Sequence, residues 1–336
     1  MTQTPTTTRQ IALASRPHGK PETHDFRVET VDLPELGAEE ILVRNTVMSV
    51  DPYMRGRMND VKSYVAPFDV GSPLDGGAVG EVIASRSAKV AVGSQVLHGS
   101  GWREHAILPA AAASVVDVGA APASRYLGIL GMTGLTAYVG LTAVAEMREG
   151  DTVFVSGAAG AVGQAAGQIA RALGAGKVIG SAGSANKVAR IRELGYDEAF
   201  NYKDGPVHDG LRAAAPEGID VYFDNVGGDH LEAAIGELRL FGRVAMCGAI
   251  SQYNATEPPP GPHNLSLAIG KNLTLRGFIV GQYAHLAQEY RGKAAEWLAG
   301  GRLQGDETFR DGLENAPQAF IDMLGGANTG KMLVRL

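Results

Sequence analysis

The fold is decided by residues 151–187, which read DTVFVSGAAGAVGQAAGQIARALGAGKVIGSAGSANK. The opening segment is short, apolar and β-branched, as in a strand buried in a parallel sheet. Gly157, Gly160 and Gly163 follow, and the small and apolar residues after them predict a helix whose N-terminus can receive a pyrophosphate. A glycine turn alone is weak evidence, because glycines also serve plain turns, but a second strand, KVIGSAG, follows at the spacing of a βαβ unit. The stretch therefore predicts a dinucleotide-binding site.

The end of the second strand indicates which dinucleotide is bound. A protein that reads the ribose 2′-hydroxyl of NAD(H) normally carries Asp or Glu at this point. This chain has Ser181, Ala182, Gly183 and Ser184, followed by Lys187. The lysine could be an ordinary solvated residue at a helix start. Since the acid is missing and an ammonium attracts a 2′-phosphate, NADP(H) is expected in preference to NAD(H).

Length and composition predict a globular protein of two domains. At 336 residues the chain is long for a single core. A net charge of −6 and a pI near 5.8 give no basic surface for nucleic acid or for acidic membranes. The first ten residues lack the apolar core of a secretion signal, and the uncharged stretch 126–145 is better explained as a buried helix than as a membrane span. The single cysteine, Cys247, excludes an internal disulfide and multi-cysteine zinc sites, so a cytoplasmic protein is expected.

Residues 9–108 predict a compact, barrel-like β domain, because short strands follow one another between Gly, Pro and Asp turns. The loop SVDPYMRGRMND, residues 49–60, lies between two of these strands and is followed by Tyr64. Tyr53 and Tyr64 are either core aromatics with a satisfied hydroxyl or residues that line a substrate pocket. The sequence leaves both interpretations open.

From residue 151 to 280, strands and helices alternate, which predicts a doubly wound parallel sheet with its ligand beyond the C-terminal ends of the strands. Asn225, Cys247, Ser251 and Phe278 lie at or just beyond such ends. The segment HLEAAIGELRLF, residues 230–241, is expected to be helical. The proline-rich loop that begins SQYNATEPPP at residue 251 is long enough to be a lid or a binding loop.

The last strand, KMLVRL, would most simply return to the first domain. We therefore expect residues 1–125 to form the first segment of the β domain, 126–296 the nucleotide-binding domain, and 297–336 the return segment.

Motifs along nearly the whole chain resemble those of the medium-chain dehydrogenase/reductase superfamily, in its zinc-independent branch of NADPH-dependent double-bond reductases. The resemblance rests, in order, on SVDPYMRGRM, GMTGLTAY, SGAAGAVG, GSANK, FNYK, YFDNVGG, CGAISQYN and NTGKMLV. It implies a Rossmann domain with a GroES-like β-barrel domain, an NADPH cofactor and a homodimer. Thr133 departs from the pattern, since the family usually has proline there, and the loop after Tyr253 varies between members.

The resemblance also implies roles for individual residues. Tyr253 is similar to the tyrosine that acts as proton donor or carbonyl polariser. On the residues alone, Tyr53 and Tyr64 are the candidates for substrate contact. Lys187 and Tyr202 resemble the residues that bind the 2′-phosphate. The other implied cofactor contacts are Gly160, Ala161, Val162 and Gly163 at the pyrophosphate, and Asn225, Cys247, Ser251, Phe278, Val280 and Asn328 around the nicotinamide half.

A reduction without metal requires a substrate that is already electrophilic, and a conjugated carbonyl meets this need. One cysteine cannot build the zinc site of alcohol dehydrogenases, although His98, Glu104 and His105 could in principle hold a metal. The sequence therefore favours reduction of an enone or enal by hydride addition at the β-carbon, with Tyr253 stabilising the enolate. A quinone reductase and a non-catalytic NADPH-binding protein are the alternatives.

Overall fold

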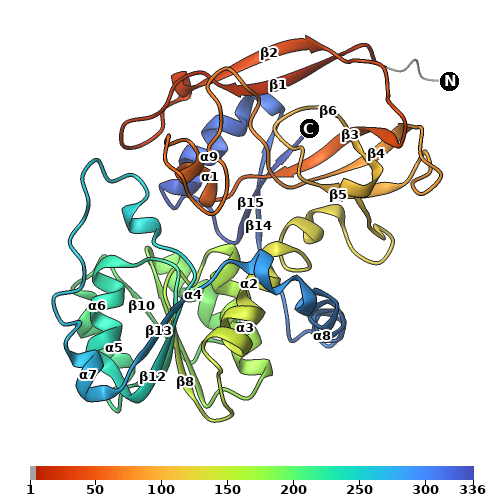
Figure 1. Ribbon diagram of the computed structural model, residues 1–336. Helices are drawn as coiled ribbons and strands as arrows, with labels where there is room; N and C mark the ends of the chain where they lie inside the picture. Colours follow the sequence, from red (N-terminus) through yellow and green to blue (C-terminus); the bar gives the residue numbers. More distant parts are fainter. Residues whose placement is uncertain (1–4) are drawn as a thin grey trace. The chain divides into compact units, whose positions relative to one another are not determined.

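The computed structural model describes residues 5–336, which form two compact units (Figure 1). The first consists of Met1–Leu127 and Glu307–Leu336, and the second of Gly128–Asp306. Residues 1–4 of the N-terminal segment discussed above lie outside the described residues. The chain passes between the units after residues 127 and 306, whereas the sequence places boundaries after 125 and 296. Helix α8 (Ala287–Ala299) continues through 296, and its Trp297 lies in the core of the second unit.

The second unit is built, within the described residues, around a parallel sheet in the order β10-β9-β8-β11-β12-β13. This order reverses between β8 and β11, as in a doubly wound Rossmann sheet. The strands are β8 (Thr152–Val155), β9 (Lys177–Ala182), β10 (Glu198–Asn201), β11 (Ile219–Asp224), β12 (Leu238–Met246) and β13 (Thr274–Gly277). The helices are α2 (Met132–Val139), α3 (Ala161–Ala172), α4 (Ala185–Glu193), α5 (Val207–Ala214), α6 (Gly228–Glu237), α7 (Leu267–Lys271) and α8.

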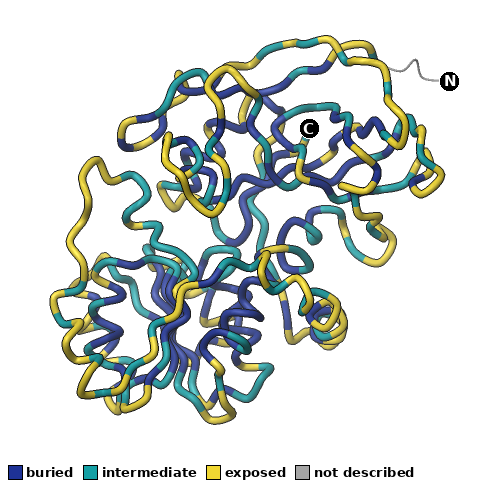
Figure 2. The backbone as a smooth tube through the Cα atoms, in the orientation of Figure 1, coloured by how far each residue is buried: buried dark blue, intermediate teal, exposed yellow. Residues whose placement is uncertain are grey.

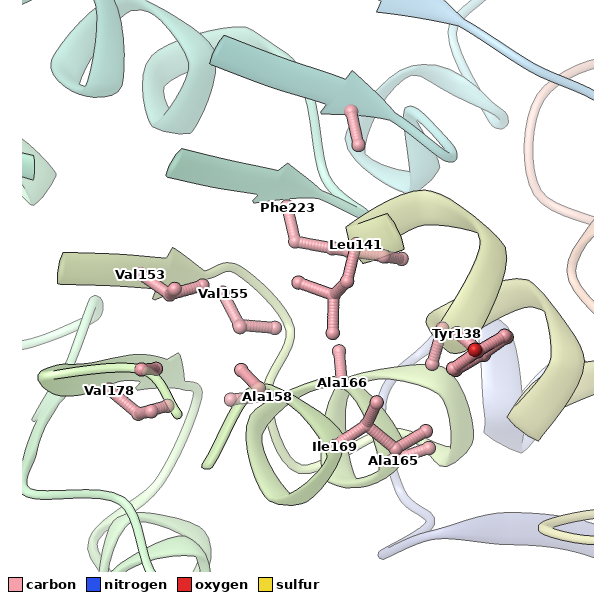
Figure 3. Close-up of a cluster of buried hydrophobic side chains, with 14 of the residues drawn as sticks. Tyr138, Leu141, Val153, Val155, Ala158, Ala165, Ala166, Ile169, Val178 and Phe223 are labelled. Carbon is pink, nitrogen blue, oxygen red and sulfur yellow. The ribbon is translucent and has the colours of Figure 1, made fainter. Parts of the chain in front are cut away.

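Strand β8 is apolar from Val153 to Val155 because both of its faces are covered there. Val153 and Val155 point into the cluster that packs against Ala166 of α3 (Figure 3). Phe154 points to the opposite face and stacks on Tyr222 of β11, with ring centroids 5.0 Å apart. A parallel sheet buried on both faces requires this composition, and the central strands β8, β9 and β11 are mostly buried (Figure 2).

Two predicted segments differ in detail from the structure. The stretch 126–145 contains helix α2, which continues as a π-helical turn over Gly140–Val144, and much of it is buried. No helix within residues 5–336 combines the length and the apolar character needed to cross a bilayer. The expected helix 230–241 ends at Glu237, because Leu238 already pairs with Ile219 and starts strand β12.

The first unit contains a mixed sheet with the order β14-β15-β3-β4-β5-β7, to which β6 is added at β3. The last strand, β15, pairs antiparallel with β3 and so joins the return segment to the N-terminal one. The elements are β3 (Glu40–Ser49), α1 (Tyr53–Arg57), β4 (Ala78–Ser85), β5 (Gln95–His98), β6 (His105–Pro109), β7 (Ser114–Val115), β14 (Glu307–Asp311), α9 (Ala316–Leu324) and β15 (Lys331–Arg335), with a separate ribbon of β1 (Thr7–Leu13) and β2 (Phe26–Asp32).

Candidate functional site

The turn between β8 and α3 brings two stretches of backbone unusually close together. Gly157 has a φ of 59°, which favours glycine, and its carbonyl accepts the N–H of Gly160 at 3.0 Å. A Cβ atom on Gly163 would lie 2.6 Å from the Cα of Ala158, so a side chain is excluded there. The glycine at this position therefore lets the first turn of α3 lie directly against the preceding turn.

The predicted pyrophosphate residues occupy the N-terminus of this helix. Gly160 is the N-cap, and Ala161, Val162 and Gly163 form the first turn, which carries no acidic side chain. Backbone N–H groups in a first helical turn have no partner within the helix, and the helix dipole adds positive potential. The local structure thus fits an anion such as a pyrophosphate.

Tyr202 lies against Gly183, just beyond the end of β9, and Lys187 lies in the first turn of α4, which begins shortly after Gly183. Ser184 caps α4 by accepting the backbone N–H of Lys187 at 3.4 Å. A Cβ on Gly183 would lie 2.8 Å from the Tyr202 hydroxyl oxygen, and the Tyr202 ring meets His230 edge-on at 5.1 Å. Burial, followed by the nearby ammonium of Lys203, lowers the pKa of Lys187 below its ordinary value.

A residue that the sequence analysis does not single out, Asp224, organises the ends of β11 and β12. Its carboxylate is buried and accepts the hydroxyl of Tyr222 at 2.7 Å and the backbone N–H groups of Val226 and Gly227 at 2.9 and 2.8 Å. Burial raises the pKa of Asp224 although these donors favour its charged form. Ser156 adds a further link, because its Oγ accepts the N–H of Asn225 at 3.0 Å. The only sequence signal for this role is an acid directly before the predicted Asn225.

Asn225, Cys247, Ser251 and Tyr253 are brought together beyond these two strand ends. The Asp224 carbonyl accepts the N–H of Cys247 at 2.9 Å, and Ser251 Oγ donates to the Val226 carbonyl at 2.6 Å. The Asn225 amide donates to the Ser156 carbonyl at 2.8 Å.

Tyr253 follows the 3₁₀ turn Ile250–Gln252 and folds back over residues 248 and 249. The backbone N–H of Ala249 donates to its hydroxyl oxygen at 3.4 Å. A Cβ on Gly248 would lie 3.2 Å from that oxygen and 3.4 Å from the Asn225 carbonyl. The tyrosine oxygen is therefore placed beside the strand ends rather than in the outer part of the loop.

Phe278 and Val280 follow the next strand, β13. The Phe278 ring is buried and meets Phe223 and Tyr283 edge-on, at 6.5 and 6.3 Å. Val280 starts the 3₁₀ segment Val280–Leu286 and packs at the margin of the same core.

Tyr53, Tyr64 and Asn328 belong to the first unit. Tyr53 begins α1 and is half-buried, and burial together with Asp51 raises its pKa. Asp51 is itself buried in an ion pair with Lys331 of β15. Tyr64 is 62% exposed, and the Asn328 amide donates to the Gly330 carbonyl at 2.6 Å.

The residues considered as metal ligands do not form a ligand group. Glu104 is paired with Arg9 at 2.6 Å, and His98 Nδ1 accepts the N–H of Ser100 at 3.1 Å. Burial lowers the pKa of His98 to about 4 and that of His105 below its ordinary value. Within residues 5–336, no three His, Cys, Asp or Glu side chains are arranged to hold a metal ion.

Two family models match the chain, one in each unit. Residues 9–116 match the N-terminal domain of oxidoreductase, and residues 161–300 match a model described as zinc-binding dehydrogenase. A Rossmann sheet in one unit and a mixed β sheet in the other define the class of two-domain dehydrogenases and reductases.

Several relatives match nearly the whole length of the chain. The NADPH-dependent curcumin reductase of Escherichia coli is 40% identical, with 98% of this chain and 96% of that protein covered. The NADP(+)-dependent 2-alkenal reductase of Nicotiana tabacum is 41% identical, with 97% and 96% covered. The structure of CurA from Vibrio vulnificus in complex with NADPH has a TM-score of 0.93 at 40% identity, covering 97% of this chain and 98% of that one. The chain therefore belongs to the medium-chain dehydrogenase/reductase family, in its branch of NADP-dependent double-bond reductases. The predicted fold class, a Rossmann sheet with a GroES-like β domain, is confirmed.

The environment of Cys247 predicts an unreactive thiol. Burial, with a smaller contribution from Asp224, raises its pKa to about 12, so the thiolate is scarce at pH 8. Because the thiolate is the nucleophile, alkylation of the native protein by iodoacetamide at pH 8 should be at least about 100-fold slower than alkylation of the urea-unfolded chain. The single cysteine makes mass spectrometry a direct measure of this ratio. Equal rates in the two states would contradict the assigned environment.

Proposed function

We propose that the protein reduces the C=C bond of α,β-unsaturated ketones or aldehydes with NADPH. The observation that carries the proposal is the position of the Tyr253 oxygen, held against Gly248 and Ala249 beside the ends of β11 and β12. In a Rossmann sheet this edge receives the cofactor. Membership of a family that includes alkenal and curcumin reductases supports the same substrate class.

The residues around the strand ends fit the parts of the cofactor. The glycine turn and the first turn of α3 would hold the pyrophosphate, and Lys187 with Tyr202 the 2′-phosphate. The nicotinamide half would contact the groups beyond β11, β12 and β13, together with Asn328 from the first unit. These contacts are Asn225, Cys247, Ser251, Phe278, Val280 and Asn328.

Reduction of a conjugated C=C bond requires a hydride donor and a hydrogen-bond donor. NADPH, when bound, supplies the hydride that adds to the β-carbon of the substrate. Negative charge then develops on the carbonyl oxygen, and a positioned O–H donor stabilises it in a site from which water is excluded. Tyr253 is the proposed donor. It either donates a hydrogen bond to the enolate oxygen while a proton adds to the α-carbon, or protonates that oxygen to give an enol, which tautomerises to the saturated carbonyl product. Tyr53 and Tyr64 are the proposed substrate contacts.

A substrate panel tests the reaction class. We expect NADPH oxidation with short alkenals, long-chain enones or aromatic dienones, and none with their saturated analogues, because hydride addition needs the conjugated bond. Mass spectrometry of the product should show a saturated C–C bond and an intact carbonyl. Turnover of quinones alone would instead indicate a quinone reductase. Tight NADPH binding without any oxidation would indicate a non-catalytic binding protein.

Removal of the Tyr253 hydroxyl tests the mechanism. Tyr253→Phe should lower kcat by about 100-fold, the typical effect of losing one oxyanion donor, and leave NADPH affinity unchanged. Steady-state kinetics and a fluorescence titration of NADPH give the two quantities. Tyr126→Phe is the matched control, because that hydroxyl only donates to the Asp117 carbonyl in the first unit. Full activity of Tyr253→Phe would transfer the donor role to Tyr53 or Tyr64.

We further propose that the protein acts as a homodimer in the cytoplasm. The single cysteine suits a reducing compartment. Strand β13 is the last of its sheet within the described residues, and Leu265, Leu267 and Ile269 nearby in sequence are exposed apolar side chains. An edge strand and exposed apolar residues are typical of an association surface.

Sedimentation analysis tests the dimer. We expect a mass of twice 35.1 kDa, and a shift toward the monomer for Ile269→Lys, which places a charge at a side chain that is 82% exposed. Val61→Lys, an exposed apolar site in the first unit, is the matched control. A monomeric wild-type protein would refute the proposal.

A further inference from the structure

Lys203 follows Tyr202, one of the two residues proposed for the 2′-phosphate, just beyond the end of β10, and its backbone is held by a side-chain turn. Its backbone N–H donates to Asn201 Oδ1 at 3.2 Å. The Asn201 amide donates in turn to Asp204 Oδ1 at 2.6 Å, and the Asp204 N–H donates to the Asn201 carbonyl at 3.1 Å. This arrangement, in which an Asn side chain closes its own turn, fixes the backbone of Lys203.

The side chain of Lys203 ends over the same glycine as Tyr202. A Cβ on Gly183 would lie 2.8 Å from the Tyr202 hydroxyl oxygen and 3.3 Å from Lys203 Cε. Gly183 directly precedes Ser184, the N-cap of the helix that carries Lys187. The Tyr202 hydroxyl and the Lys203 side chain therefore lie beside the glycine that precedes the helix of Lys187.

Lys203 differs from charged residues of α4, which take part in ion pairs. Arg190 of α4 contacts Glu193 and Asp306, and Arg192 contacts Glu198. The ion pairs within residues 5–336 do not include Lys203, which is exposed. The closeness of Lys203 also contributes to the lowered pKa of Lys187. Two neighbouring cations repel each other, and a dianion between them would convert this cost into attraction.

We propose that Lys203 is a second cation for the 2′-phosphate of the cofactor and helps to determine the preference for NADPH over NADH. The inference rests on the proposed use of NADPH. It assigns Lys203 an electrostatic contact, with Tyr202 as hydroxyl donor and Lys187 as the more buried cation. A plain solvated lysine in the turn would have no effect on the cofactor.

Adenosine 2′,5′-bisphosphate and adenosine 5′-monophosphate are the probes, since they differ only in the 2′-phosphate. For Lys203→Ala, isothermal titration calorimetry should show binding of the bisphosphate weakened by about 5- to 20-fold, as expected of one partly exposed charge contact, with binding of the monophosphate unchanged. Lys203→Arg should restore most of the affinity. The same pattern is expected for NADPH compared with NADH.

Two comparison variants distinguish failure of the inference about Lys203 from failure of the proposed use of NADPH. Lys187→Ala should weaken bisphosphate binding by about tenfold or more, as for a hydrogen bond to a charged group. Lys89→Ala removes one exposed charge from the first unit and should change nothing. Loss of affinity in Lys187→Ala but not in Lys203→Ala would overturn the inference and leave the proposed function standing. A wild-type protein that binds the two nucleotides equally would overturn the assignment of NADPH itself.

Discussion

The close approach of α3 to the turn after β8 is the constraint on which the nucleotide-binding unit depends. A Cβ at Gly163 would overlap with Ala158, so the helix reaches its position only with glycine there. Tyr196 strengthens the same contact from the other side, because its hydroxyl donates to the Gly163 carbonyl at 2.6 Å and its ring lies against Gly167. The helix N-terminus is thereby fixed at the edge of the sheet where the strand order reverses, and this edge is the expected position of a dinucleotide.

In the other half of the sheet, Asp224 fixes the backbone at the corresponding strand ends. Its carboxylate holds the turn after β11 through Val226, and its carbonyl accepts the N–H groups of Cys247 and Gly248 at 2.9 and 3.0 Å. One residue therefore positions the loops after two adjacent strands. A buried carboxylate is costly unless it is fully hydrogen-bonded, and the donors from Tyr222 and the backbone meet this requirement. Replacement by a residue that cannot accept these bonds would leave several buried donors unsatisfied.

Much of the nucleotide-binding unit could be predicted from local patterns in the sequence. Residues 151–187 contain a complete βαβ unit whose glycines, spacing and missing acid are all short-range features, so the sheet and the preference for a phosphate follow from them. The strand start at Leu238 could not be predicted, because the helical pattern runs through it and pairing with Ile219, a distant residue, decides the outcome. The role of Asp224 depends likewise on Ser156, directly after β8, and on loop backbone. Lys203 follows Tyr202 in the sequence, yet its relation to Lys187 arises only when β9 and β10 pair.

The loop after Tyr253 is anchored at both ends, so the position of the proposed donor does not depend on the sequence in the middle of the loop. Tyr253 is fixed by backbone at residues 248 and 249, next to the strand ends. The far end of the loop is tied to α6, where the His263 N–H and the Asn264 amide donate to Glu232 at 3.0 and 2.8 Å. Much of the segment between these points is exposed and contains consecutive prolines. Its sequence can therefore change without moving the tyrosine, because both ends are anchored independently.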